Sequence, residues 1–210
     1  MSIRVVLADD HVLVRQGLKS LLEREKLQVI AEASDGQEAV RFSESLHPDI
    51  AVVDISMPTL NGIDAAREMS RCCPKTKTIL LTQHEEDQYI REALEAGVRG
   101  YVLKSQAAND LVHAIQQVSR GQFYLSPGVS RAVVEAYRTK SQMPADPLTV
   151  RERQVLQLIA EGKRTREIAE LLGVSVKTAE SHRTHITKKL GISETAGLVR
   201  YALQRGLSQL

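Results

Sequence analysis

Residues 49–58, DIAVVDISMP, decide how the first half of this chain folds. The run Ile50–Val53 is apolar on both alternating faces, which is typical of a central parallel strand covered by helices on each side. Asp54 stands where that strand ends. The carboxyl ends of the strands form the ligand crevice of an open α/β sheet, so its carboxylate is placed for chemistry. Pro58 and Gly62 indicate the turn that follows.

Taken alone, Asp54 is as readily a helix-capping or turn aspartate. Polar residues at the ends of three other predicted strands favour a site instead: Asp9 and Asp10, Thr82, and Lys104. Clustered carboxylates repel one another, and a bound Mg²⁺ ion, which prefers oxygen ligands, commonly neutralises their charge. A metal beside Asp54 would let it attack the phosphorus of an anionic donor, while Lys104 and Thr82 hold the phosphoryl oxygens. The set predicts an aspartyl-phosphate acceptor.

The first 120 residues alternate between strand and helix patterns, which predicts a parallel, doubly wound sheet of five strands. Strands are expected near residues 3–8, 27–33, 49–54, 77–82 and 99–103. Helices are expected near residues 12–24, 36–46, 62–71, 86–96 and 107–119. The fold class of this half is therefore α/β, of the flavodoxin-like type.

Length and charge indicate two domains with different partners. A chain of 210 residues has room for two modest cores. Residues 1–120 carry 14 Lys and Arg against 18 Asp and Glu, a net charge of −4, whereas residues 121–210 carry 14 against 8, a net charge of +6. Only the basic second half is suited to a polyanion.

No apolar run approaches the roughly 18 residues that a membrane-spanning helix needs, and the N-terminus lacks a basic segment followed by an apolar core. We therefore expect a soluble, cytoplasmic protein. The two cysteines, Cys72 and Cys73, are adjacent and lack the spacing of a disulfide framework or metal site, so we expect them to be reduced and structural.

Residues 1–120 resemble the receiver domain of two-component response regulators. The matching residues are Asp9, Asp10, Asp54, Met57, Pro58, Gly62, Thr82, Tyr101 and Lys104. The resemblance implies that Asp54 accepts phosphate from a sensor histidine kinase. It also implies that Asp10, Asp54 and the backbone carbonyl of Ser56 bind Mg²⁺, with Asp9 acting through water. Thr82 and Tyr101 would then form the switch pair that reports phosphorylation to the surface.

Three features depart from that family or vary within it. Gln83 follows the switch threonine where a small residue is common, and would narrow the approach to the phosphoryl group. Ser105 follows Lys104 where proline is common, so a cis peptide is not expected, because without proline it costs roughly 2.5–4 kcal/mol. His84 and Ser56 flank the site and either tune the lifetime of the phosphoryl group or simply face solvent.

Residues 121–147 are predicted to be a linker with a short helix. Gly121 ends the last helix of the first domain, and Ser126 with Pro127 forms a good helix start. The apolar stripe of that helix would be Val129, Val133, Val134 and Tyr137. Residues 139–147 have no periodicity and two prolines, which predicts a flexible tether.

From residue 148 to 210 the pattern is purely helical. Thr149 has the spacing of a capping box with Glu152, which predicts a helix up to Gly162. A second helix should begin near Thr165, and after a glycine turn a third should run from Ser175. The inner face of the third comprises Ala179, His182, Ile186 and Leu190. Two helices joined by a short glycine turn in a basic segment indicate a helix-turn-helix.

The third helix is the expected reader of DNA. Its outer face carries Lys177, Glu180, Ser181, Thr184 and Lys188. Early residues on that face should reach base edges in the major groove. Phosphate contacts are expected from Lys177, Arg183, Lys188 and Lys189. Glu180 either accepts a hydrogen bond from a cytosine amino group or is a solvated acid offset by its basic neighbours.

This half resembles the output domain of the NarL/FixJ (LuxR-type) regulators, through residues 148–156, 167–169, 177–183 and 189–191. The resemblance implies a four-helix domain whose last helix, near residues 193–206, mediates dimerisation. That helix offers the apolar stripe Leu198, Val199, Ala202 and Leu203, although packing within the domain is the alternative.

The sequence therefore predicts a DNA-binding response regulator, a transcription factor switched by phosphorylation of Asp54 and not an enzyme. Its partners would be a histidine kinase, promoter DNA and a second copy of itself. One alternative keeps the first domain as a phosphate-independent dimerisation module. Another is an α/β phosphatase that uses Asp54 as a nucleophile with turnover. Coupling between the halves would act through dimerisation, through release of a masked output domain, or through both.

Overall fold

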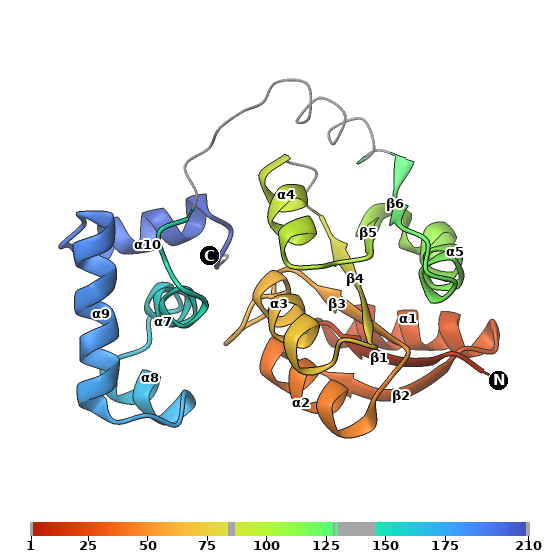
Figure 1. Cartoon of the computed structure of the whole chain (residues 1–210), viewed down its shortest axis with the longest axis horizontal. Coiled ribbons are helices and arrows are strands. Elements are labelled where there is room, and N and C mark those ends of the chain that lie inside the picture. Colours follow the sequence, from red (N-terminus) through yellow and green to blue (C-terminus); the bar gives the residue numbers. More distant parts are fainter. Residues whose placement is uncertain (1, 84–86, 128, 130–145, 209–210) are drawn as a thin grey trace. The chain divides into compact units, whose positions relative to one another are not determined.

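The computed structural model describes residues 2–83, 87–127, 129 and 146–208, and these form two compact units (Figure 1). The predicted helix containing Val133, Val134 and Tyr137 lies outside the described residues, as do His84 and the tether up to residue 145. Among the described residues, every helix is too short or too polar to cross a membrane.

The first unit is built on a parallel sheet with the order β2-β1-β3-β4-β5-β6. The strands are β1 (Arg4–Ala8), β2 (Gln28–Ala33), β3 (Ile50–Asp54), β4 (Lys77–Thr82), β5 (Gly100–Leu103) and β6 (Tyr124–Leu125). All five residues of β3 are buried, as the two-sided apolar run predicted. The α/β fold class is therefore confirmed, with a strand order in which β3 lies between β1 and β4.

The sixth strand corrects the prediction of five strands and a linker that begins at residue 121. Tyr124 pairs with Gly100 and Leu125 with Tyr101, which extends the sheet beyond β5. The hydroxyl of Ser126 accepts a hydrogen bond from the Leu103 amide at 3.3 Å. A strand of two residues is too short to show a period, so only its pairing with β5 reveals it.

Helices cover both faces of this sheet. They are α1 (Val12–Arg24), α2 (Gly36–Leu46), α3 (Gly62–Cys72), α4 (Asp87–Glu95) and α5 (Ala107–Ser119). Helix α1 packs against α5, while α3 packs against both α2 and α4. The core between the sheet and α1 and α5 includes Leu7, Leu22, Val52, Leu81 and Leu111. The two cysteines are free, with their Sγ atoms 3.4 Å apart.

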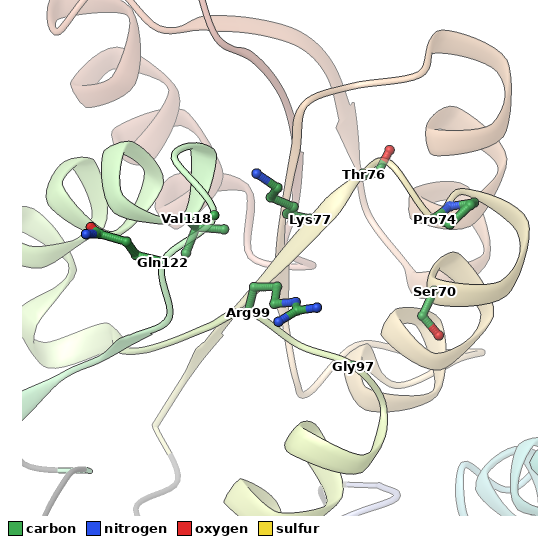
Figure 2. A pocket seen from close by; sticks show the side chains of 9 residues that line it. Ser70, Pro74, Thr76, Lys77, Gly97, Arg99, Val118 and Gln122 are labelled. Atoms are coloured by element: carbon green, nitrogen blue, oxygen red, sulfur yellow. The ribbon is translucent and has the colours of Figure 1, made fainter.

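A cavity of about 330 Å³ opens where β4 begins (Figure 2). Asp54 lies at the other end of the sheet, where β3 ends. Its lining residues are Ser70, Pro74, Thr76, Lys77, Gly97, Arg99, Val118, Gly121 and Gln122. The Lys77 ammonium donates to the Ser119 carbonyl at 2.8 Å, and the Thr76 hydroxyl donates to the Pro48 carbonyl at 2.8 Å. These groups are thus used to close the loops at this end of the sheet.

The second unit contains the four predicted helices, α7 (Val150–Ala160), α8 (Thr165–Leu171), α9 (Val176–Leu190) and α10 (Thr195–Gln204). Thr149 and Glu152 form the predicted capping box at the start of α7. Gly173, with φ of +62°, makes the turn between α8 and α9, and the Ser175 side chain caps α9. The core between the helices includes Leu156, Ile168, Ala179, Ile186, Leu198 and Ala202.

Candidate functional site

Four neighbouring strands of the first unit end in polar residues, as the sequence predicted. Asp54 is the last residue of β3 and is 2% exposed, and Asp9 follows β1 and is 0% exposed. Thr82 ends β4 and is buried, and Lys104 follows β5. Because β1, β3, β4 and β5 are adjacent and parallel, their carboxyl ends bring these side chains to one edge.

The ammonium of Lys104 lies between two buried carboxylates. Its Nζ atom is 2.8 Å from Oδ2 of Asp54 and 2.9 Å from Oδ2 of Asp9. The Ser56 amide also donates a hydrogen bond to the Asp54 carboxylate. Two carboxylates and one ammonium leave this buried cluster with an excess of negative charge. A buried excess charge is costly, so the cluster is suited to another cation.

Burial raises the pKa of Asp54, and the nearby Lys104 ammonium opposes this shift without cancelling it. Burial lowers the pKa of Lys104, but the carboxylates of Asp54 and Asp9 raise it by more, so its net shift is upward. Lys104 thus limits the rise in the pKa of Asp54, and the carboxylates hold the pKa of Lys104 above its ordinary value. Lys104 remains an ammonium at neutral pH and can meet an anionic group bound to Asp54.

The residues that could hold a metal ion include one that the sequence reasoning missed. Ligand atoms of Asp9, Asp10, His11 and Asp54 lie within 4.8 Å of one another. His11 places Nδ1 2.7 Å from Oδ1 of Asp10, and its amide donates to Oδ1 of Asp9 at 2.9 Å. Its position next to the two aspartates was the available signal. Mg²⁺ prefers oxygen ligands, so the three carboxylates fit it, while the His11 imidazole is placed to orient Asp10.

Gly62 allows the start of α3 to approach the end of β3. A Cβ atom on Gly62 would lie 2.0 Å from the Asp54 carbonyl oxygen, which is far inside contact distance. The Gly62 amide donates to the Ile55 carbonyl at 2.9 Å and closes the loop between the two elements. Only glycine can occupy this position without moving the backbone that carries Asp54.

The other predicted residues of this site lie on or directly after β4 and β5. Tyr101 is 1% exposed and pairs with Leu80, whereas Thr82 pairs with Leu103 at the end of the two strands. Both Tyr101 and Thr82 have polar or ring contacts. Gln83 is exposed. The peptide between Lys104 and Ser105 is trans, and these residues open a short 3₁₀ helix.

Helix α9 in the second unit separates an inner from an outer face at the predicted period. Ala179 and Ile186 are 1% and 0% exposed, and His182 is half-buried. The five residues predicted for the outer face are all exposed: Lys177, Glu180, Ser181, Thr184 and Lys188. Of the other two predicted DNA contacts, Lys189 is exposed and Arg183 is half-buried. The Thr184 hydroxyl donates to the Glu180 carbonyl at 3.0 Å, within the helix itself.

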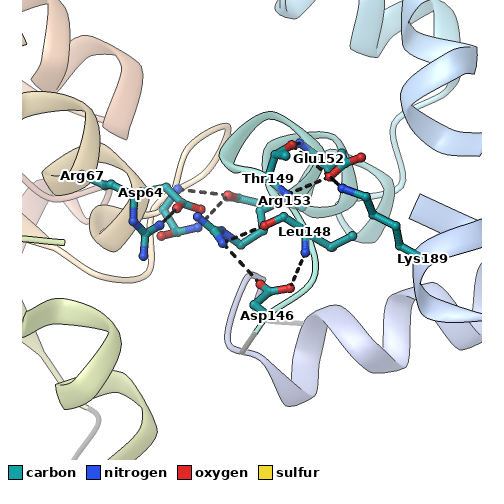
Figure 3. A network of polar contacts seen from close by, with 10 residues as sticks. Asp64, Arg67, Asp146, Leu148, Thr149, Glu152, Arg153 and Lys189 are labelled. Carbon is teal, nitrogen blue, oxygen red and sulfur yellow. Dashed lines mark hydrogen bonds and ion pairs between the residues drawn. The ribbon is translucent and has the colours of Figure 1, made fainter. Parts of the chain in front are cut away.

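Two basic residues of α9 contact other parts of the helical unit. The Arg183 guanidinium donates to the Thr195 hydroxyl at 2.7 Å, and the Lys189 Nζ atom is 2.6 Å from Oε2 of Glu152 (Figure 3). Glu152 is only 4% exposed. The sequence reasoning grouped Lys189 with the phosphate contacts, because the helical period alone does not show which acid lies across the domain.

The apolar stripe predicted for dimerisation divides into two pairs. Leu198 and Ala202 are 0% exposed and belong to the core of the helical unit. These two residues therefore pack within the domain, and the prediction that they mediate dimerisation is corrected. Val199 and Leu203 are only half-buried, so they retain surface for a partner.

Two family models match this chain. Residues 5–116 match the response regulator receiver domain, and residues 146–202 match the bacterial regulatory proteins of the luxR family. The transcriptional regulatory protein MctR of Rhizobium johnstonii is 40% identical over 98% of this chain and 95% of its own length. LiaR of Bacillus subtilis, also a transcriptional regulatory protein, is 38% identical over 95% and 96%.

Solved structures of response regulators are similar as well. A LuxR-family response regulator from Aurantimonas is 34% identical, with a TM-score of 0.63 over 66% of this chain and 99% of that one. The response regulator RcsB in complex with DNA is 28% identical, with a TM-score of 0.62 over 96% and 98%. The chain therefore belongs to the response regulators with a LuxR-type output domain, which receive phosphate from a histidine kinase and bind DNA to regulate transcription.

Proposed function

We propose that Asp54 is the residue that accepts the phosphoryl group, and that Lys104 is its electrostatic partner. The observation that carries this proposal is the Lys104 ammonium held 2.8 Å from Asp54 among buried carboxylates. A carboxylate oxygen of Asp54 attacks the phosphorus, and the bond from phosphorus to its leaving group breaks. Lys104 and the Thr82 hydroxyl then contact the phosphoryl oxygens, where an ammonium and a donor offset the transferred charge.

The carboxylates of Asp9, Asp10 and Asp54, with the carbonyl of Ser56, are the proposed ligands of Mg²⁺. Three acidic side chains with ligand atoms within 4.8 Å of one another supply the oxygen donors that this ion requires. When bound, Mg²⁺ would neutralise charge on the carboxylates and on the phosphoryl donor. The Nδ1 atom of His11 lies 2.7 Å from Oδ1 of Asp10, directly beside these ligands.

Phosphate uptake by the full-length protein tests the assignment of Asp54. Acetyl phosphate with Mg²⁺ should add one phosphoryl group to the wild type, measured by intact mass, and none to Asp54→Asn. Asp49→Asn is the matched control, because Asp49 lies at the opposite end of the same strand, where it accepts a hydrogen bond from the Arg4 amide. Uptake by Asp54→Asn would show that another residue is the acceptor.

The same experiment separates a signalling site from an enzyme. We propose that Asp54 carries one phosphoryl group as a signal and does not turn over substrates, in line with the family. The wild type should release no more than one equivalent of alcohol from a phosphate ester. Continued release that depends on Asp54 would instead identify a phosphatase.

The outer face of α9 is the proposed DNA surface, and the protein would act on promoter DNA in the cytoplasm. Exposed Lys177 and Lys188 neutralise backbone phosphates, whereas Glu180, Ser181 and Thr184 reach base edges. Arg183 keeps its charge while it donates to a neutral hydroxyl, so it remains a phosphate contact. We place the output domain at residues 148–210 and the receiver domain at residues 1–120 together with β6.

Phosphorylation would raise DNA affinity through a homodimer, because two recognition helices on adjacent half-sites bind better than one. Val199 and Leu203 of α10 are the residues proposed to contribute apolar surface. The mass of the protein in solution should double with acetyl phosphate and Mg²⁺, and Val199→Glu should prevent the increase. A fragment of residues 145–210 that binds DNA better than the unphosphorylated full-length protein would indicate masking instead.

A further inference from the structure

Lys188 and Lys189 are adjacent, basic and located in the last turn of α9, yet their surroundings differ. Lys188 is exposed, and no acidic partner is found for it among the described residues. Lys189 has its ammonium 2.6 Å from Oε2 of Glu152, and its side chain is 37% exposed. A sequence pattern treats the two as equivalent, whereas the structure does not.

Glu152 is a buried carboxylate with three donors on one oxygen. Its Oε2 atom accepts from the Thr149 amide at 2.7 Å, the Thr149 hydroxyl at 2.9 Å and the Lys189 ammonium at 2.6 Å (Figure 3). Its side chain is only 5% exposed. Burial raises the pKa of Glu152, but Lys189 and Thr149 lower it by more, so the net shift is downward and Glu152 is ionised at neutral pH.

The pair also connects opposite helix ends. Glu152 lies in the first turn of α7, near the positive end of that helix dipole, and Lys189 lies in the last turn of α9, near its negative end. Helix α9 has only two fully buried side chains, Ala179 and Ile186, along its length from Val176 to Leu190. Leu190 in its last turn is only partly buried against the core of the unit, and the ion pair with Glu152 adds a polar contact at the same end.

We propose that Lys189 is a positioning residue that holds the recognition helix through Glu152, and that it does not contact DNA phosphate. To reach a phosphate, Lys189 would have to leave a buried carboxylate without its counterion, which is strongly unfavourable. Its charge is already neutralised, so it releases no DNA counterion. Lys188 provides the phosphate contact at this end of the helix. This inference rests on the DNA-binding role proposed for α9.

The salt dependence of DNA binding distinguishes the two lysines. Full-length protein with acetyl phosphate and Mg²⁺ would be titrated against a fluorescent random-sequence duplex, at salt concentrations from about 50 to 200 mM. Lys188→Met should reduce the slope of log K against log[salt] by about 0.9, the value for one phosphate contact. Lys189→Met should leave the slope unchanged. An equal reduction by Lys189→Met would overturn the proposal.

Hydrogen exchange in the same full-length variants tests, without DNA, whether the pair of Lys189 and Glu152 holds the recognition helix. Lys189→Met should raise amide exchange in α7 and α9 by roughly tenfold, as expected for loss of a hydrogen bond to a charged group, while Lys188→Met should not. Lys189→Arg should restore protection, because it keeps the charge and the donor. If Lys189→Met fails to fold and Lys188→Met folds, that outcome would also support the positioning role of Lys189.

The double variant Glu152→Gln with Lys189→Met completes the test. The double variant has no buried carboxylate without a partner, so its amides in α7 and α9 should be better protected from exchange than those of Lys189→Met alone. If the losses of protection in the two single variants add in the double variant, Glu152 and Lys189 do not act as a pair. If Lys188→Met also leaves the salt slope unchanged, Lys188 is not the phosphate contact at this end of α9. Hydrogen exchange would still decide whether Lys189 holds the helix through Glu152.

Discussion

The receiver domain buries its charged site, with Asp54 and Asp9 at 2% and 0% exposure, whereas the output domain exposes Lys177 and Lys188 on α9. Buried charges interact strongly, and a buried charge is costly to leave unpaired. Exposed charges interact weakly and are screened by salt. The difference predicts where substitutions act on stability and where they act only on binding. Glu152 and Lys189 are the exception, because in the domain with the exposed charges they pair a buried carboxylate with a partly exposed ammonium.

Removing the central cation of the receiver site should have the largest effect on stability. Lys104→Met leaves two buried carboxylates facing each other, so we expect a loss of about 3 kcal/mol in the free energy of unfolding without Mg²⁺. Urea unfolding of the full-length protein measures it. The double variant Lys104→Met with Asp54→Asn should recover most of the loss, and a double variant as unstable as the single one would contradict this.

The pH dependence of the Lys104→Met variant has a defined sign. Without the ammonium, the pKa of Asp54 rises further above its ordinary value near 4, so the folded state binds protons more tightly than the unfolded state. The stabilisation that the protonated Asp54 carboxyl contributes is therefore present at low pH, and it is lost as the pH rises through the folded-state pKa of Asp54. The deficit relative to wild type should be larger at about pH 8 than at about pH 5.

A methyl group at the approach between β3 and α3 tests packing without changing charge. Gly62→Ala should cost about 2 kcal/mol, because the added Cβ must displace the backbone of Asp54. Phosphate uptake from acetyl phosphate should also fall, because the displaced backbone carries Asp54. Gly17→Ala on α1 is the control, because no atom lies within 4 Å of its added Cβ. Normal uptake by Gly62→Ala would show that the strand end is less rigid than the geometry indicates.

Glu152→Gln removes the buried charge of the output domain. We expect a loss of roughly 1.5 kcal/mol at neutral pH, since the charged hydrogen bonds to Lys189 and Thr149 are weakened. The pKa of Glu152 is lowered in the folded state, so its stabilisation is present above the ordinary value near 4.3 and lost as pH falls through the folded-state pKa. Hydrogen exchange of α7 should therefore differ from wild type at neutral pH and converge with it in acid.

The smallest effect is expected on the outer face of α9. Glu180→Gln should leave the free energy of unfolding unchanged and alter the preference among DNA sequences by about 1 kcal/mol at one base pair. Selection from a random duplex library with the phosphorylated protein measures the preference. If Glu180 is only a solvated acid, the selected sequences will not change and affinity for all duplexes will rise together.

The strands and helices of the receiver could be predicted because each is long enough to show its period. The apolar run from Ile50 to Val53 and the turn at Gly62 place Asp54 at a strand end, and the parallel order brings Asp9 and Lys104 beside it. His11 was missed although it is adjacent to the aspartates, because its Nδ1 contact to Asp10 depends on side-chain orientation and not on spacing. Strand β6 was missed because two residues show no period.

In the output domain, the helices, the caps of α7 and α9 and the outer face of α9 could be predicted from the sequence, since these follow from local spacing and the helical period. The roles of residues that meet across the domain could not be predicted in this way and follow from the three-dimensional packing. It distinguished Lys189 from Lys188 by placing Glu152 beside it, and it buried Leu198 and Ala202 in the core. The physical reason is that period and propensity act within a few residues, whereas charge pairing and core packing depend on which distant residues the fold brings together.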